Sequence, residues 1–178
     1  MPTGSIVACD PFVFFDTVPF TQRVPAGKYT VLASIAQLNA EERTAYLKLK
    51  ISDELTMHWE LAVLPGQDPK TLLPGMYFGY PVDSGVGSMM DAGAAAYFLK
   101  KLEDEASHNR DDYANFMVSE MEKKRVQTWD WGIFGQPGSP ANMVAVSSGL
   151  GDGRYPSYFG FDAEGRVTEF VTDFLLVD

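Results

Sequence analysis

Apolar and polar residues alternate through the first third of the chain, which predicts β-strands. In RTAYLKLKIS (43–52), every second residue from Ala45 to Ile51 is apolar, and tyrosine and lysine lie between them. The stretches 27–37 and 55–64 are also rich in β-branched and aromatic residues, which favour strands. Short turn segments join the three, so we expect an antiparallel meander. The preceding segment 10–20 is interrupted by prolines, and we expect it to be irregular.

The pattern becomes helical between about 91 and 125. The segment AGAAAYFLKKLEDEA (92–106) is rich in alanine and leucine, and RDDYANFMVSEMEKKRV (110–126) carries apolar residues at helical spacing, from Tyr113 to Met121. Asp91 precedes the first of these segments, where a carboxylate can accept the unpaired N–H groups of the first turn. The sequence therefore predicts two consecutive helices, with Asp91 as the N-cap of the first.

Strand patterns return in the last third of the chain, at 128–134, 142–148, 157–162 and 166–177. The last two are joined by a tight turn in which Gly165 takes the position that most needs a positive φ. The predicted fold is α+β, with antiparallel sheets in a sandwich-like or strongly curved arrangement and two helices inserted before a C-terminal β-hairpin. A length of 178 residues suits one domain, 1–178.

Composition and charge narrow the classes of function. Hydrophobic residues make up 46% of the chain, which is enough for a real core, and the formal net charge is -10. An acidic surface repels phosphate backbones, so we expect no nucleic-acid partner. The same surface suits a basic protein partner. The single cysteine, Cys9, excludes an internal disulfide and is interpreted as a small buried hydrophobe.

The sequence gives no indication of export or of a membrane. Its first fifteen residues have no basic segment followed by an apolar core, which is not typical of a signal peptide. No apolar run approaches the roughly 18 residues that cross a bilayer. We therefore expect a soluble, cytoplasmic protein without a membrane partner.

Two glycine-rich loops carry the candidate chemistry. In SGLGDGRYPSY (148–158), Gly151 and Gly153 flank Asp152; in VDSGVGSMMD (82–91), Gly85 lies between Asp83 and Asp91. Because glycine has no side chain, the backbone of such a loop can turn its N–H groups toward an anion or its carbonyls toward a cation. Neither loop matches a phosphate-binding loop, a dinucleotide fingerprint or an EF-hand.

One hypothesis is a metal-assisted hydrolase acting on a phosphoester or a nucleotide-like ligand. Oxygen-rich sites suit magnesium, manganese or calcium, and such an ion activates water. The acid on the otherwise apolar last strand, Asp173, needs a partner if it is buried, and a metal would provide one. The expected roles are metal ligands Asp83, Asp152 and Asp173, catalytic base Asp91 or Glu60, and ligand-binding residues Gly85, Gly151, Gly153, Arg154 and Tyr155.

Structural roles explain the same acids equally well. Asp91 can cap its helix, Asp83 and Asp152 can stabilise turns, and Asp173 can pair with Arg154 or Arg166. Two other functions then remain open. One is a non-catalytic immunity or antitoxin protein that neutralises a basic toxin; the other is a module that binds a small-molecule ligand in the same pocket.

The chain resembles a widespread bacterial family that is known only as a domain of unknown function. The resemblance lies in a VDSG…D segment (82–91) and a closing SGxGDGxYPxYxGxDxxGxVxxxxxDF pattern (148–174). An upstream W-E-x-A strand (59–62) and a lead-in with P-F…V-P-x-G-x-Y (19–29) also match. The resemblance covers nearly the whole chain. It implies that the two glycine–acid segments belong to one pattern, and it implies no activity.

Overall fold

The chain folds into two antiparallel sheets, a short strand pair and two helices, an α+β fold. The computed structural model describes residues 1–13, 16–104, 109–135 and 139–177. The five-stranded sheet has the order β2 (Thr30–Leu38), β3 (Glu41–Lys50), β11 (Val167–Asp173), β10 (Ser157–Phe161), β4 (His58–Leu61). The four-stranded sheet has the order β1 (Ile6–Cys9), β6 (Val86–Asp91), β8 (Asn142–Ser147), β7 (Trp131–Gly135).

The remaining elements connect and cover these sheets. Strands β5 (Tyr80–Val82) and β9 (Gly153–Tyr155) pair separately, and Pro69–Thr71 forms a 3₁₀ turn. The predicted helices are α1 (Ala92–Asp104) and α2 (Asn109–Glu122), which contact the four-stranded sheet. The end of the first predicted helical segment, at 105–106, and residues 14–15 of the predicted irregular segment lie outside the described residues. No helix in the described part of the chain is long and apolar enough to cross a membrane.

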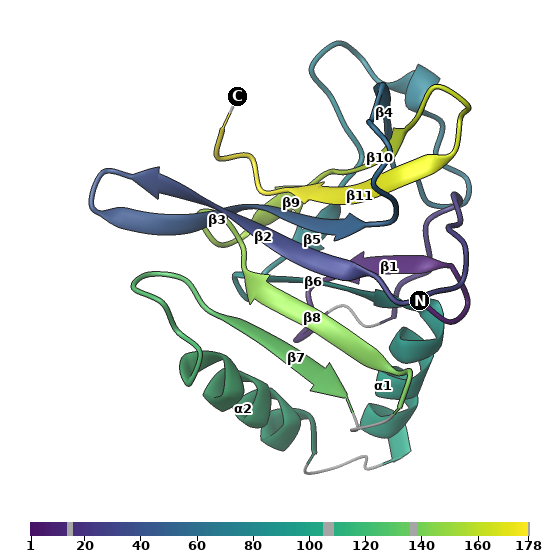
Figure 1. Ribbon diagram of the computed structural model, residues 1–178. Helices are drawn as coiled ribbons and strands as arrows, with labels where there is room; N and C mark the ends of the chain where they lie inside the picture. The colour runs from purple at the N-terminus through teal and green to yellow at the C-terminus, as the bar shows by residue number, and fades with distance from the viewer. Residues whose placement is uncertain (14–15, 105–108, 136–138, 178) are drawn as a thin grey trace.

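The four-stranded sheet is the middle one of three layers (Figure 1). One of its faces packs on the five-stranded sheet, through a core that includes Ile6, Met89 and Phe170. The other packs on the helices, through a core that includes Met90 and Phe98. At β1 both faces are covered, so all four residues are buried and the strand reads IVAC without alternation. This is why the alternating pattern did not predict β1.

The predicted meander is wrong in one respect. Strands β2 and β3 form the expected hairpin, but β4 does not pair with β3. The C-terminal hairpin β10–β11 lies between them, since β11 pairs with β3 and β10 pairs with β4. The segment after β3 crosses the end of β11, where the amides of Ile51 and Ser52 both donate to the Thr168 carbonyl.

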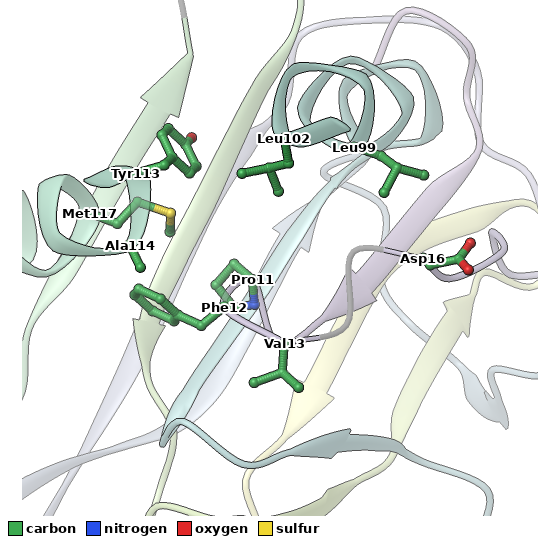
Figure 2. A pocket seen from close by; sticks show the side chains of 9 residues that line it. All are labelled: Pro11, Phe12, Val13, Asp16, Leu99, Leu102, Tyr113, Ala114 and Met117. Carbon is green, nitrogen blue, oxygen red and sulfur yellow. The ribbon is translucent and has the colours of Figure 1, made fainter. Parts of the chain in front are cut away.

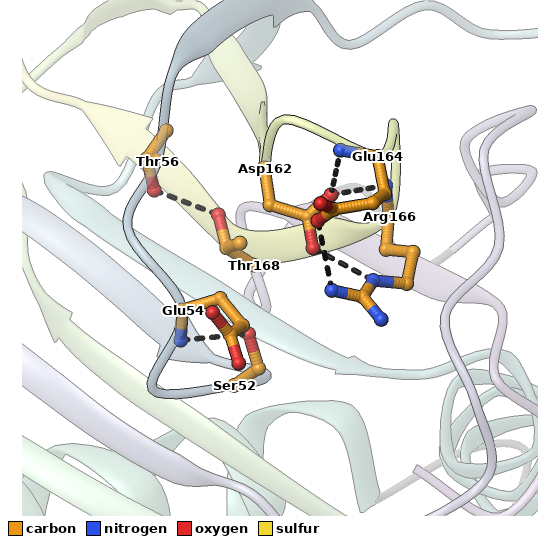
Figure 3. Close-up of polar contacts among 7 residues, drawn as sticks. All are labelled: Ser52, Glu54, Thr56, Asp162, Glu164, Arg166 and Thr168. Atoms are coloured by element: carbon orange, nitrogen blue, oxygen red, sulfur yellow. Dashed lines mark hydrogen bonds and ion pairs between the residues drawn. The ribbon is translucent and has the colours of Figure 1, made fainter.

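Asp162 organises the turn of that C-terminal hairpin (Figure 3). Its carboxylate accepts the amides of Glu164 and Arg166 at 2.9 and 2.8 Å, and the Arg166 Nε at 2.7 Å. Burial alone would raise the pKa of Asp162, but these donors hold it below its usual value. Gly165 has a φ of 75°, as the turn chemistry predicts. Beside the turn, the hydroxyls of Thr56 and Thr168 lie 2.7 Å apart and fix the crossing segment on β11.

Replacing Phe170 by alanine tests the core between the sheets. Phe170 is fully buried, and its ring lies 5.0 Å from that of Phe159 and 5.3 Å from that of Phe20, between centroids. We expect Phe170→Ala to lower the free energy of unfolding by about 3–5 kcal/mol, measured by urea denaturation. Leu150→Ala is the control, because Leu150 is 72% exposed. A loss as small as that of the control would contradict this packing.

Candidate functional site

The two glycine-rich loops lie against each other. The amide of Ser148 donates to the Gly85 carbonyl at 2.9 Å, and Val82 pairs with Gly153 where β5 meets β9. A Cβ built on Gly85 would lie 3.7 Å from the Gly151 Cα. The structure therefore brings together the backbone of the two segments that the sequence singled out.

The second loop uses its own polar groups to close its turn. The Gly151 carbonyl accepts the Tyr155 hydroxyl at 2.7 Å and the Ser148 hydroxyl at 2.9 Å. Gly151 has a φ of 109°, which favours glycine. Asp152 points into solvent, and the exposed Arg154 donates to the Gly79 carbonyl at 2.8 Å. These bonds account for the glycines and for Tyr155 as parts of a turn.

A buried carboxylate that sequence reasoning missed, Asp10, holds the first loop. Its Oδ2 accepts the amides of Asp83 and Ser84 at 2.9 and 2.8 Å. Its Oδ1 accepts the Ser84 hydroxyl and the Phe12 amide, both at 2.8 Å. Asp10 is completely buried, while Asp83 is exposed. In the sequence, Asp10 is recognisable only as an aspartate that directly follows an apolar run. That pattern is too common to indicate a buried carboxylate that holds a loop.

Asp91 caps α1, as one of the two interpretations predicts. Its Oδ1 accepts the Gly93 amide at 2.8 Å, and its Oδ2 accepts the amide and the hydroxyl of Thr3, both at 2.9 Å. It also ends β6, which begins at Val86. Because a strand rises about 3.3 Å per residue, Asp91 lies roughly 17 Å from Val86 and from the loop that Asp83 begins.

The predicted acids do not gather around one point. Over residues 1–13, 16–104, 109–135 and 139–177, no three His, Cys, Asp or Glu side chains are placed to hold a metal ion together. Glu60 lies on edge strand β4, where its carboxylate is exposed and 3.5 Å from the His58 Nε2. Cys9 is buried, as expected, and burial raises the pKa of its thiol to about 12.

Asp173 belongs to a hollow on the outer face of the five-stranded sheet. The hollow has a volume of about 380 Å³, within the range of small-molecule sites. On β11, Asp173 shares its face with Glu169 and Val171, as the alternation predicts. The hollow is lined by Ser34, Tyr46, Lys48, Trp59, Tyr158, Val171 and Asp173.

Strand register brings three aromatic side chains to this face. Tyr46 is directly opposite Asp173 on neighbouring strands, and Tyr158 is opposite Val171. Trp59 is opposite Gly160, and a Cβ at Gly160 would come within 3.0–3.1 Å of the indole ring. The glycine therefore leaves room for the indole to lie flat against the strand. Trp59 is 48% exposed.

Asp173 has no ion-pair partner among the described residues, although a lysine lines the same hollow. Lys48 pairs with Glu169, with 2.8 Å between Nζ and Oε2. Asp173 accepts the Leu175 amide at 2.7 Å, and no described lysine, arginine or histidine forms an ion pair with it, including Arg154 and Arg166. Burial raises the pKa of Asp173. Burial, together with the nearby Asp173 and Tyr77, raises the pKa of Tyr158.

Two other cavities are less suited to serve as a ligand-binding or active site. Figure 2 shows an apolar crevice between the 11–13 segment and the two helices, with Leu99, Leu102 and Met117 around it. Its volume is about 70 Å³, room for only a few water molecules. A larger cleft of about 830 Å³ opens between the two sheets beside β2. Its only predicted site residue is Asp91, whose carboxylate is already engaged by Thr3 and Gly93.

The chain belongs to the family described as protein of unknown function DUF4241, whose profile matches residues 1–172. This agrees with the resemblance to a family of unknown function. A comparison with curated proteins found no match. A comparison with solved structures also found none.

Replacing Asp10 tests whether a buried carboxylate shapes the first loop. Asp10→Asn puts an amide donor against N–H donors, so we expect the free energy of unfolding to fall by about 1–3 kcal/mol. Hydrogen exchange at the Ser84 amide should become faster. Asp152→Asn, a change at an exposed acid, is the control and should leave both quantities unchanged. Equal behaviour of the two variants would show that Asp10 does not hold the loop.

Proposed function

We propose that this protein is a non-catalytic binding module, and that the hollow on the outer sheet face binds the cationic group of a ligand. The observation that carries the proposal is the combination, in one open hollow, of Tyr46, Trp59 and Tyr158 with an acid that has no cationic partner among the described residues. Aromatic faces attract ammonium and guanidinium groups through the ring quadrupole. A carboxylate beside them adds a direct charge interaction.

Electrostatics supports a cation over an anion or a neutral group. The desolvation that raises the pKa of Asp173 is a free-energy cost of its ionised form, and a bound cation would offset that cost. The one lysine that lines the hollow is already paired with Glu169. The net charge of -10 also raises the local concentration of cations around the protein.

Metal-assisted hydrolysis has less support. The proposed ligands Asp83 and Asp152 are exposed at the glycine loops, whereas Asp173 lies on the outer sheet face. A site for magnesium, manganese or calcium requires several oxygen ligands around one ion. Among the described residues, no group of three acids or histidines meets this requirement.

The immunity-type alternative is favoured by a separate observation. Leu55 and Met57, just before Trp59 in the chain, are 75% and 61% exposed. A small ligand in the hollow would leave them in water, while a basic protein that inserts a lysine or arginine side chain would also cover them. This partner would use the same aromatic and acidic chemistry as a small cation.

Choline and its neutral isostere 3,3-dimethyl-1-butanol separate cation binding from simple apolar binding. We expect choline to shift the NMR signals of the hollow residues saturably, and the isostere to bind about tenfold more weakly or not at all. Trp59→Ala and Asp173→Asn should each weaken choline binding by about tenfold, because each removes one attraction. Leu150→Ala is the control. Equal binding of the two compounds, or the absence of saturation by both, would rule the proposal out.

Binding should depend on pH in a defined direction. The pKa of Asp173 is raised, so this acid takes up its proton at a higher pH than an ordinary aspartate as the solution is acidified. Affinity for choline should be full above that pKa and fall as the pH drops through it. The weaker binding by Asp173→Asn should show no such step. The measurement is choline affinity by NMR titration at a series of pH values, and a step retained in the variant would assign it to another group.

A further inference from the structure

The chain leaves β11 through a backbone conformation that leucine rarely adopts. Leu175, two residues after Asp173, has a φ of 56°, in the left-handed region, where a Cβ is crowded by the backbone. The residues just before it are fixed in the sheet. The Asp173 amide donates to the Pro156 carbonyl at 3.0 Å, and the Phe174 amide donates to the Ala45 carbonyl at 2.9 Å. A left-handed leucine persists only where the surrounding contacts impose it.

Two residues of the hollow hold this turn. The Leu175 amide donates to Oδ1 of Asp173 at 2.7 Å, in a turn where an aspartate accepts the N–H group two residues further on. Tyr46, which is opposite Asp173 on β3, donates its hydroxyl to the Val177 carbonyl at 3.4 Å. The second oxygen of Asp173, Oδ2, accepts no hydrogen bond from a described residue. The turn therefore engages one carboxylate oxygen and leaves the other available.

The second glycine-rich loop supports the turn from the other side. Phe174 is buried, and its ring meets that of Tyr155 edge-on, with 5.1 Å between the centroids. A Cβ built on Gly149 would lie 2.7 Å from the Phe174 carbonyl oxygen and 3.6 Å from Cγ of Leu176. A side chain at this glycine would therefore push against the backbone on which Leu175 turns. The close approach gives Gly149 a role that the bonds within its own loop do not explain.

We propose that Leu175 and Gly149 are positioning residues for the hollow. The left-handed turn at Leu175, held against Gly149, fixes Oδ1 of Asp173 and leaves Oδ2 to meet the cationic group of the ligand. A carboxylate that is already fixed binds more tightly than a mobile one, because less side-chain freedom is lost on binding. This role rests on the proposed function of the hollow, and it makes the second glycine-rich loop the support of that site.

A pair of substitutions at Leu175 separates the effect of the turn from that of the side chain. Valine is β-branched and strongly disfavours a positive φ, whereas asparagine tolerates it. Leu175 is 46% exposed, so both substitutions remove little buried surface. We expect Leu175→Val to weaken choline binding by about fivefold and Leu175→Asn to bind choline like the wild type, both measured by NMR titration.

Titration of Asp173 without any ligand gives a second readout. The Leu175 amide stabilises the ionised carboxylate and so lowers the pKa of Asp173 against the effect of burial. Burial itself should change little, because β11 keeps its neighbours β3 and β10. Loss of the bond in Leu175→Val should therefore raise the pKa of Asp173 further, and Leu175→Asn should leave it unchanged, in ¹³C NMR of the carboxyl group. The other titratable groups on this face, the same in both variants, are Tyr46, Lys48, Tyr158 and Glu169.

Gly149→Ala tests the support that the loop gives. Its Cβ would displace the Phe174 carbonyl, so we expect choline affinity to fall by about fivefold and hydrogen exchange at the Leu175 amide to become faster. Gly165→Ala is the matched control. Gly165 also has a positive φ, of 75°, but it has open space around it and precedes the far end of β11. This control should lower stability without changing choline affinity.

Three results would overturn this inference. They are equal choline affinity in Leu175→Val and Leu175→Asn, the same pKa of Asp173 in these two variants, and equal choline affinity in Gly149→Ala and Gly165→Ala. If choline does not bind the wild type, the proposed function fails, and the titration without ligand still decides whether the turn positions Asp173. The two proposals can therefore fail separately.

Discussion

Burial of the four-stranded sheet on both faces is the constraint on which the rest of the structure depends. Ile6 and Ala8 of β1 face one core, and Val7 and Cys9 face the other. A sheet with two apolar faces must be covered on both, so the helices and the five-stranded sheet are held on opposite sides of it. The outer face of the five-stranded sheet then stays open to solvent and to ligands.

This arrangement also determines where polar groups can lie. Asp10, Asp91 and Asp162 are all buried at the ends of strands, and each carboxylate accepts backbone N–H groups. Such bonds make a buried charge tolerable, and they fix the loops that follow the strands. These three aspartates therefore stabilise two loops and a helix start, while Asp173 differs in facing an aromatic hollow.

Local patterns in the sequence predicted the local structure well. The alanine-rich segment, the cap at Asp91, the turn at Gly165 and the alternating face of β11 depend on near neighbours, and all four are present. The α+β class followed from the same patterns. Strand order did not, because the insertion of β10–β11 beside β3 depends on contacts across more than a hundred residues. The extent of a single domain over 1–178 remains a prediction.

The candidate site was less predictable for the same reason. The two glycine loops lie against each other, but the sequence could not show that their backbone groups are engaged within the turn. The hollow depends on cross-strand register, which sets Tyr46 opposite Asp173 and Trp59 opposite Gly160. Periodicity assigns a residue to one of two faces without indicating which face is exposed.

The position of the C-terminal hairpin has a consequence for synthesis of the protein. Strands β3 and β4 are made early, yet the strands that lie between them, β10 and β11, are made last. Until β10 and β11 have left the ribosome, β3 has an open edge and Leu47 and Leu49 lack Phe170 as a packing partner. Assembly of the five-stranded sheet therefore waits for β10 and β11, and until then the growing chain is exposed to aggregation and to chaperone binding.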